Sequence, residues 1–312
     1  MTLEDNAEIH TNENPIKIDR DTTVYATFQK ESVYANPLTA NELEVQLVNG
    51  NNVNVTVKIN SYLRGKICIP NKITWAPGGG DPEEYNVIGL LSSKIESNDF
   101  TRVVADEGMD GGNLSWQPYV THIFFSGCDD RSGVSITPDL IDSFPANCFY
   151  GDDRLVYVDL PASLAQIKAN AFQNLPKLSP TIFNNMKNVA RFEAVALYGA
   201  WLDQMNTGEY NMTLYLSSNI YNGYNGQVGR IAGNAFGATP IQKIVIGSNK
   251  SPITAAALNA IQQDAFANCE GLTEIVAYAA RSTVSQDALI ANIQNGLDDI
   301  KKEVVEITVV PV

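Results

Sequence analysis

The sequence predicts a β-rich α/β solenoid, in which short parallel strands from successive coils stack into a right-handed array. A small residue followed by Phe recurs four times, at Cys148-Phe149, Ala171-Phe172, Ala235-Phe236 and Ala265-Phe266. The first two copies are 23 residues apart, and a fixed spacing of this size is typical of stacked repeats. Patterns before and after these copies predict an antiparallel β cap at the amino end and a helix-strand cap at the carboxyl end.

Residues 1–20 are rich in Asn, Glu and Asp, and we expect a flexible arm there. Residues 21–75 are expected to form the amino-terminal β cap. Within it, two runs of alternating apolar residues, 43–47 and 53–59, flank Asn49-Gly50, so they predict a hairpin. A stack of coils needs such a cover because an open end would expose core residues and unpaired strand groups.

Residues 76–283 are expected to form the solenoid itself. In the run 156–160, alternation predicts that Val156, Val158 and Leu160 point inward, whereas Tyr157 and Asp159 point outward. Each small-Phe pair would then fill the core at a returning turn. One coil cannot bury its own apolar face, so stability must spread from coil to coil.

Two segments, one inside the repeat region and one after it, have apolar residues at helical spacing. Residues 188–204 have no Ala-Phe pair, and their apolar spacing predicts a helix in place of a turn. Residues 284–312 are expected to form the carboxy-terminal cap. Ser285 would begin a helix that runs to about Lys302, and 304–310 would form a closing strand.

The repeat resembles the BspA-like branch of the leucine-rich repeat family over about residues 65–280. Ala265-Phe266 with Cys269, Leu272 and Ile275 carries the likeness best, and Leu160-Pro161 supplies the Leu-Pro element of the repeat. The resemblance implies a leucine-rich repeat fold that serves for protein interaction or adhesion. Many relatives of this type are exported to bacterial surfaces.

Composition narrows the classes of partner. The formal charge of −14 and the absence of a basic cluster argue against binding to nucleic acid or to anionic membranes. No apolar run approaches the roughly 18–20 residues that cross a bilayer, so we expect no direct membrane insertion. Residues 1–6 have no basic start or apolar stretch of a secretory signal. We therefore expect a virion or cytoplasmic location if Met1 is native, and a bacterial cell surface if an export signal was removed.

We expect no catalytic residue, no metal site and no cofactor. The only histidines are His10 and His122, and neither lies in a nucleophile motif. The pairs Asp129-Asp130, Asp152-Asp153 and Asp298-Asp299, with Asp106, Glu107 and Asp110, are interpreted as solvated turn residues, because they lack the spacing of a calcium loop. The four cysteines show no Cys-x-x-Cys spacing, and we interpret them as small buried hydrophobes rather than as a disulfide framework.

The predicted partner-binding residues lie on the outward strand face and in one coil insertion. Aligning the strands on the inward residues Phe125, Leu160, Phe183, Leu216, Ile246 and Ala277 gives an outward column that is mostly apolar. The stretch 216–231 is about eight residues longer than 160–167, and its Tyr, Asn and Gly residues are typical of binding loops. The predicted site is Phe124, Tyr157, Ile182, Tyr215, Tyr221, Tyr224, Val245 and Val276.

These observations favour a non-catalytic protein-interaction or adhesion module. A structural component of a phage virion or another large assembly is the alternative within binding proteins. A polysaccharide hydrolase that uses paired carboxylates is the alternative from another class. Protein, glycan and self-association all remain open as partners.

Overall fold

The computed structural model describes residues 37–57, 64–91, 119–125, 140–152, 154–158, 160–179, 182, 186, 188–208, 210–254, 259–281 and 284–312. All of them belong to one compact unit, Tyr34–Val312. The predicted arm at residues 1–20 lies outside the described residues. The predicted domain boundaries, the right-handed sense of the array and the capping roles remain predictions.

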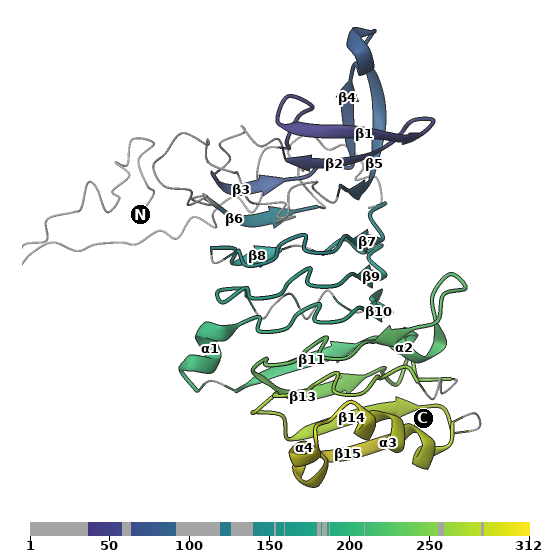
Figure 1. Ribbon diagram of the computed structural model, residues 1–312. Helices are drawn as coiled ribbons and strands as arrows, with labels where there is room; N and C mark the ends of the chain where they lie inside the picture. The colour runs from purple at the N-terminus through teal and green to yellow at the C-terminus, as the bar shows by residue number, and fades with distance from the viewer. Residues whose placement is uncertain are drawn as a thin grey trace, which may run out of the picture. The chain divides into compact units, whose positions relative to one another are not determined.

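The described strands form four sheets, whose strands alternate along the chain, and Figure 1 shows the strands from β6 to β15 stacked in layers. The first sheet has the order β1 (Leu43–Asn49), β2 (Asn52–Val57), β5 (Glu83–Leu90), β4 (Lys72–Trp75). The second has the order β3 (Arg64–Cys68), β6 (Tyr119–Phe124), β8 (Tyr157–Val158). The third has the order β12 (Arg230–Ile231), β10 (Arg191–Phe192), β9 (Gln166–Ile167), β7 (Ser143–Phe144). The fourth has the order β11 (Met212–Leu216), β13 (Ile241–Ile246), β14 (Glu274–Ala279), β15 (Glu306–Pro311).

Every strand pair in the second, third and fourth sheets is parallel, as stacked coils require. The first sheet is mixed. β1 and β2 pair antiparallel across Asn49–Asn52, which is the expected hairpin, while β2 and β5 pair parallel. A single 3-10 turn, η1 (Pro77–Gly79), separates β4 from β5.

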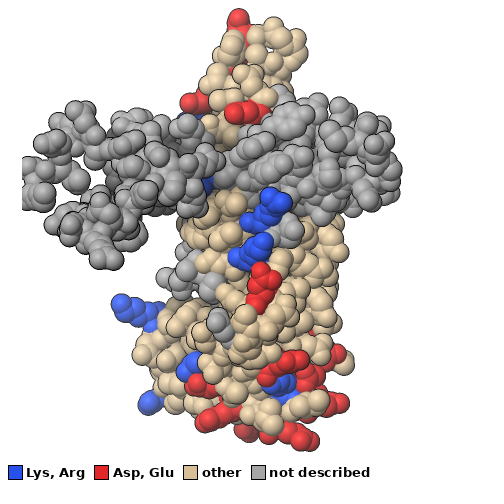
Figure 2. Space-filling view, turned by 90° about the vertical axis from the view of Figure 1, so that its left-hand side faces the viewer, with Lys and Arg blue, Asp and Glu red and all other residues tan. Residues whose placement is uncertain are grey.

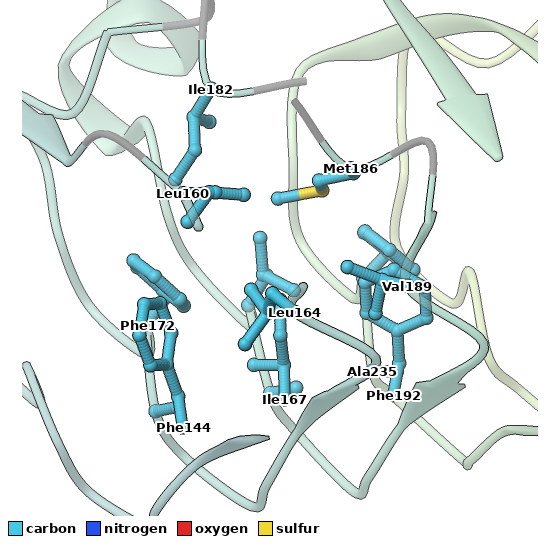
Figure 3. Packing of buried hydrophobic residues seen from close by; sticks show 14 of the residues in the cluster. Phe144, Leu160, Leu164, Ile167, Phe172, Ile182, Met186, Val189, Phe192 and Ala235 are labelled. Carbon is cyan, nitrogen blue, oxygen red and sulfur yellow. The ribbon is translucent and has the colours of Figure 1, made fainter. Parts of the chain in front are cut away.

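The core is built from inward residues of each coil's strand and from one large apolar side chain of its turn, which we call the plug. Phe149, Phe172, Phe236 and Phe266 are all fully buried, as the repeat pattern predicted. Figure 3 shows Phe144, Ile167 and Phe192 from successive strands in this core, together with Phe172. The ring centroids of Phe149 and Phe172 are 5.0 Å apart, so neighbouring plugs contact each other directly. The core therefore runs from coil to coil.

Backbone hydrogen bonds join the turns of successive coils. The amides of Phe149, Phe172, Leu197, Phe236 and Phe266 donate to the carbonyls of Ala171, Ala196, Ala235, Ala265 and Gly296, at 2.7–3.0 Å. The residue two positions before each of these donors has a left-handed backbone, at Asn147, Asn170, Val195, Asn234 and Asp264. Asn and Asp tolerate this conformation well because their short polar side chains form local hydrogen bonds.

The helix predicted over 188–204 is wrong. This segment contains β10 and a turn, and α1 (Leu202–Asn206) begins only near its end. Ala196-Leu197 makes the backbone hydrogen bonds that the small-Phe pairs make in the other coils. The segment is therefore a coil of the repeat, although it lacks the Ala-Phe motif. The helical spacing was misleading because a plugged turn also places apolar residues three and four positions apart.

The carboxyl end differs from the prediction in its details. The expected single helix is two helices, α3 (Gln286–Asn295) and α4 (Asp299–Val304), and Gly296 follows the first of them. Ser285 begins α3, with its Oγ accepting from the amide of Ala288 at 3.4 Å. Val304 ends α4, and the strand β15 begins at Glu306.

Some predicted side-chain directions were also wrong. Phe125, Leu160, Leu216, Ile246 and Ala277 point into the core, as predicted. Ile182 was expected to face outward, but it is fully buried in the core, and Phe183 lies outside the described residues. Ile182 itself is not part of a described strand, so the alternation of a strand could not give the direction of its side chain. Val156, expected inside, is half-buried because it precedes β8.

Candidate functional site

The outward face of the fourth sheet carries one aligned row of side chains. Strand register pairs Tyr215 with Val245, Val245 with Val276, and Val276 with Thr308. These four residues are called the outer column below. Tyr215 is 45% exposed, Val245 is half-buried and Thr308 is exposed. Val276 is only 9% exposed, yet it does not belong to the core cluster.

A charged row runs beside the outer column. Register places Lys243 next to Glu274, and Glu274 next to Glu306. Lys243 Nζ and Glu274 Oε1 form an ion pair at 2.7 Å, with both side chains partly exposed. Figure 2, which views another side of the molecule, shows charged side chains of both signs gathered at the carboxyl-terminal end. The outer column is thus an apolar strip beside a polar one.

A hollow of about 440 Å³ lies where β11 and β13 end. Its walls come from two consecutive coils and from Asn188 of the coil before them. We call it the serine groove, and it is lined by Asn188, Tyr215, Leu216, Ser217, Ser218, Asn219, Gly247, Ser248 and Ser251. Tyr215 therefore belongs both to the outer column and to the groove.

Hydrogen bonds fix the walls of the serine groove. The Oγ of Ser217 accepts from the amide of Asn219 at 3.0 Å, and the Oγ of Ser248 accepts from the amide of Ser251 at 3.1 Å. The hydroxyls of Ser218 and Ser251 lie 3.1 Å apart and share a hydrogen bond between the two coils. The two turns are therefore held against each other.

Gly247 is required on the floor of the serine groove. Its φ is +70°, in the region that favours glycine, and its amide donates to the carbonyl of Leu216 at 2.9 Å. A Cβ there would lie 3.0 Å from the carbonyl oxygen of Ser251 and 3.6 Å from the Cβ of Ser218. Any side chain at this position would strain the backbone and crowd the carbonyl of Ser251 in the same turn.

The insertion after β11 forms α2 (Asn219–Asn222) and a tight loop. The backbones of Tyr224 and Gln227 exchange two hydrogen bonds, at 3.0 and 2.9 Å, and close the loop. A second hollow of about 460 Å³ is lined by residues 221–228. Tyr224 is half-buried, and Val228 is 67% exposed.

Tyr221 was predicted to be an exposed binding residue, and that orientation is wrong. Its side chain is 3% exposed and packs in the core, where its hydroxyl has no hydrogen-bond partner among the described residues. Burial raises the pKa of this phenol well above its usual value. The residue precedes a glycine-rich loop, and its place in α2 turns it inward.

Phe124 and Tyr157 lie in a second, smaller cluster. Their ring centroids are 5.7 Å apart, and the ring of His122 lies 6.0 Å from Tyr157. Phe124 is 7% exposed and contacts Cys68, apart from the main core. His122 thus contributes to an aromatic cluster on the face opposite Ile123, which lies in the core.

The structure therefore gathers three predicted residues and separates the others. Tyr215, Val245 and Val276 form one column, Phe124 and Tyr157 form another cluster, and Ile182 and Tyr221 are core residues. Sequence reasoning missed Ser217 and Ser248. Ser217 follows the inward residue Leu216, and Ser248 follows Gly247 at the end of the next strand. Serines at the ends of adjacent strands were the sequence signal that could have revealed this pair.

Asp152 is not the solvated turn residue that we expected. It is fully buried, and its Oδ1 accepts from the amides of Arg154 and Leu155 at 3.0 and 3.1 Å. Asp298 caps α4 by accepting from the amide of Lys301 at 2.9 Å. The other predicted carboxylates, at 106, 107, 110, 129, 130 and 153, lie outside the described residues; Asp299 is exposed in α4. Within the described ranges, no three His, Cys, Asp or Glu side chains come together as a metal site.

The cysteines divide into two kinds. Among the described cysteines, Cys148 and Cys269 are buried and belong to no disulfide, as predicted, while Cys128 lies outside the described residues. Burial raises the pKa of Cys269 to about 11. Cys68 is buried but disulfide-bonded, which corrects its interpretation as a simple hydrophobe. The spacing of cysteines could not reveal this bond, because a disulfide depends on the distance between two Cα atoms in the folded chain.

No helix in the described part of the chain is both long and apolar enough to span a bilayer.

Comparison with solved structures gives distant matches to leucine-rich repeat proteins. A leucine-rich repeat protein from Bacteroides ovatus matches 86% of this chain at 11% identity and a TM-score of 0.46, and the chain spans about half (52%) of that protein. A leucine-rich cell surface protein from Faecalibacterium prausnitzii matches 88% of this chain and 95% of its own at 12% identity and a TM-score of 0.26. The pneumococcal vaccine antigen PcpA matches 88% of this chain and 98% of its own at 11% identity and a TM-score of 0.21.

No curated protein matches the chain. The model of the BspA type leucine-rich repeat region matches six times, over residues 119–203, 142–260 and 230–302. These ranges cover more than half of the sequence and all the coils that carry the small-Phe pairs. The parallel sheets and the buried plugs are the structural form of that repeat. The chain therefore belongs to the BspA type leucine-rich repeat family.

Proposed function

We propose that the chain is a non-catalytic recognition module that binds a protein partner through the outer column of its fourth sheet. The observation that carries this proposal is the register of Tyr215, Val245 and Val276 on the outward face. Solenoids use such extended faces for binding, since successive coils repeat the same position. Tyr215 is exposed and Val245 is half-buried on this face, and large side chains that share an outward row often mark an interaction surface.

The chemistry around the outer column fits a protein partner. An apolar centre with a polar rim is the usual anatomy of a protein interface. Here Val245 and Val276 form the centre, while the Lys243–Glu274 pair and Glu306 form the rim. Tyr215 adds a large amphipathic side chain, which is common at the sites that contribute most to binding.

The disposition of the carboxylates supports a non-catalytic role. Asp152 accepts two backbone amides and Asp298 caps a helix, so both are engaged in holding the fold. The paired carboxylates of a glycosidase would instead face each other across an open cleft, at about 5–9.5 Å.

The disulfide at Cys68 favours a location outside the reducing cytosol. We propose a bacterial cell surface for this reason, which also agrees with the exported relatives that the family resemblance implies. Titration of thiols in denatured, unreduced protein isolated from its native source would test this. Two reactive thiols per chain are expected, and four would contradict an oxidising location.

Site-specific photocrosslinking tests the outer column. A photoreactive amino acid at position 245 should give a discrete adduct with another protein in native extracts, and Val276→Glu should abolish that adduct. The same amino acid at position 300, on the exposed face of α4, serves as the control. An identical adduct from position 300, or none from position 245, would refute the proposal. An adduct of twice the 34.0 kDa chain would assign the face to self-association.

A further inference from the structure

The serine groove differs in chemistry from the outer column that it adjoins. Its nine lining residues contain no Asp, Glu, Lys, Arg or His. A charged ligand would find no oppositely charged side chain among these described residues, so it would lack the strong charge-assisted hydrogen bonds of an ionic site. The volume of about 440 Å³ lies within the roughly 300–1,000 Å³ of small-molecule sites. The groove therefore suits a neutral ligand of small size.

The groups that line the groove both donate and accept hydrogen bonds. The Oγ atoms of Ser217 and Ser248 each accept one backbone amide, so each hydroxyl keeps its own proton to donate. The Nδ2 of Asn188 donates to the carbonyl of Ala162 at 2.8 Å, which fixes the amide and leaves Oδ1 to accept. A ligand rich in hydroxyls is complementary, since each hydroxyl can donate and accept in turn.

One wall of the groove is an exposed aromatic ring. Tyr215 is 45% exposed and lies near the carboxyl end of β11, which stands at one end of the strand order of the fourth sheet. The negative face of an aromatic ring attracts polarised C–H groups, such as those on the apolar face of a pyranose ring. Among the described lining residues Leu216 is the one aliphatic side chain, and it is buried, so these residues offer little apolar surface to the side chains of a peptide.

We infer that the serine groove binds a neutral saccharide, with the sugar ring on Tyr215 and its hydroxyls on Ser217, Ser248 and Asn188. The inference does not depend on the outer column binding a protein. Gly247 keeps the floor low, and the Ser218–Ser251 hydrogen bond holds the two walls at a fixed separation. A rigid groove of this kind loses little entropy when it binds a ligand.

Saturation-transfer NMR on the full chain tests the inference. The probes are methyl glucoside, galactoside and mannoside, N-acetylglucosamine and their β-linked disaccharides, with glucuronic acid and N-acetylneuraminic acid as charged counterparts. We expect at least one neutral probe to bind and to shift the amide resonance of Gly247. Binding of the charged probes alone, or of no probe, would overturn the inference.

Variants then locate the site. Tyr215→Thr and the double variant Ser217→Ala/Ser248→Ala should each weaken binding about tenfold or more, the cost of one or two lost hydrogen bonds or of the ring contact. Tyr215→Phe keeps the ring and should bind within about threefold of the wild type, which shows that the fold survives a change at this position. Ile300→Ser, on α4, is the matched surface control and should bind as the wild type.

Wild-type affinity in both Tyr215→Thr and the double serine variant would place the sugar elsewhere and reject the groove. The adduct from position 245 should persist in the serine variant, so failure of either proposal is distinguishable from failure of the other.

Discussion

The ring centroid of Phe192 lies 4.8 Å from that of Phe236 in the next coil. Phe192 is in register with Ile167 on one side and Ile231 on the other, so it stands where both neighbours have Ile. Leu197, in the turn of the same coil, stands where both neighbours have Phe. This coil has therefore exchanged the positions of its large and medium side chains while keeping the core filled.

Exchanging the two positions back tests this relationship. Phe192→Ile should cost roughly 1–3 kcal/mol through a cavity, and Leu197→Phe roughly 1–3 kcal/mol through overpacking. The double variant should return to within about 1 kcal/mol of the wild type, because total volume is conserved. Urea denaturation at equilibrium gives all three free energies of unfolding. Additive penalties in the double variant would show that the two side chains do not compensate each other.

Val195 is a strained position that a substitution should relieve. Its φ is +52°, a region that costs an ordinary L-residue about 1–2 kcal/mol, whereas the equivalent positions hold Asn147, Asn170, Asn234 and Asp264. Val195→Asn should raise the free energy of unfolding by about 1 kcal/mol. Val195→Ala keeps a Cβ in the same region and should change stability much less. Thermal and urea unfolding of the pair would measure the difference, and equal stabilities would argue against strain at this residue.

Cys269 should make the stability depend on alkaline pH. Its Sγ donates to the carbonyl of Phe236 at 3.1 Å, and burial raises its pKa from 9.0 to about 11. The unfolded chain releases this proton first, so stability should fall as pH rises above about 9, by at most ~1.4 kcal/mol per pH unit, until the folded thiol also ionises near 11. Below pH 9 the residue should have no effect on the slope.

Cys269→Ala removes that titration and provides the comparison. The difference in unfolding free energy between wild type and variant should be constant from pH 6 to about 8.5 and should shrink from about pH 9 to 11. The comparison cancels the contributions of all groups that the wild type and the variant share. A constant difference across the whole range would mean that the thiol ionises equally in both states.

Asp152 should be important for stability rather than for chemistry. Asp152→Ala leaves the amides of Arg154 and Leu155 without their acceptor in a buried turn, and should destabilise the chain by about 1–3 kcal/mol. Asp152→Asn keeps an acceptor oxygen and should cost less. Partner or saccharide binding by the folded fraction should be unchanged in both variants, and a specific loss of binding without unfolding would contradict the structural role.

The repeat could be predicted because the Phe residues that fill its core recur in a short sequence motif. Ala171-Phe172, Ala235-Phe236 and Ala265-Phe266 gave the coil positions, and their complete burial follows from the need to fill one shared core. The coil of Ala196-Leu197 could not be recognised from the motif. In this coil the Phe stands in the strand, at Phe192, instead of in the turn. This becomes visible only from the strand register, which pairs Phe192 with Ile167 and Ile231.

The candidate site was predictable only where strands are regular. Alternation along β11, β13 and β14 placed Tyr215, Val245 and Val276 on the same face because each strand keeps its pleat. Ile182 is not a residue of any described strand, so the two-residue alternation of a strand did not give the direction of its side chain. The serine groove is formed by turns that meet across two coils, and such meetings depend on the stacking rather than on any local pattern.

The hydrogen-bonded ladder of turns makes one coil exchangeable for another. Every turn presents the same amide to the coil after it and the same carbonyl to the coil before it, from Phe149 through to the carbonyl of Gly296. Excising one whole coil would leave matching donors and acceptors on both sides of the cut. Ancestral genes could thus lengthen or shorten this protein by recombination within the repeat, while the segments that leave the stack, such as 217–229, changed independently.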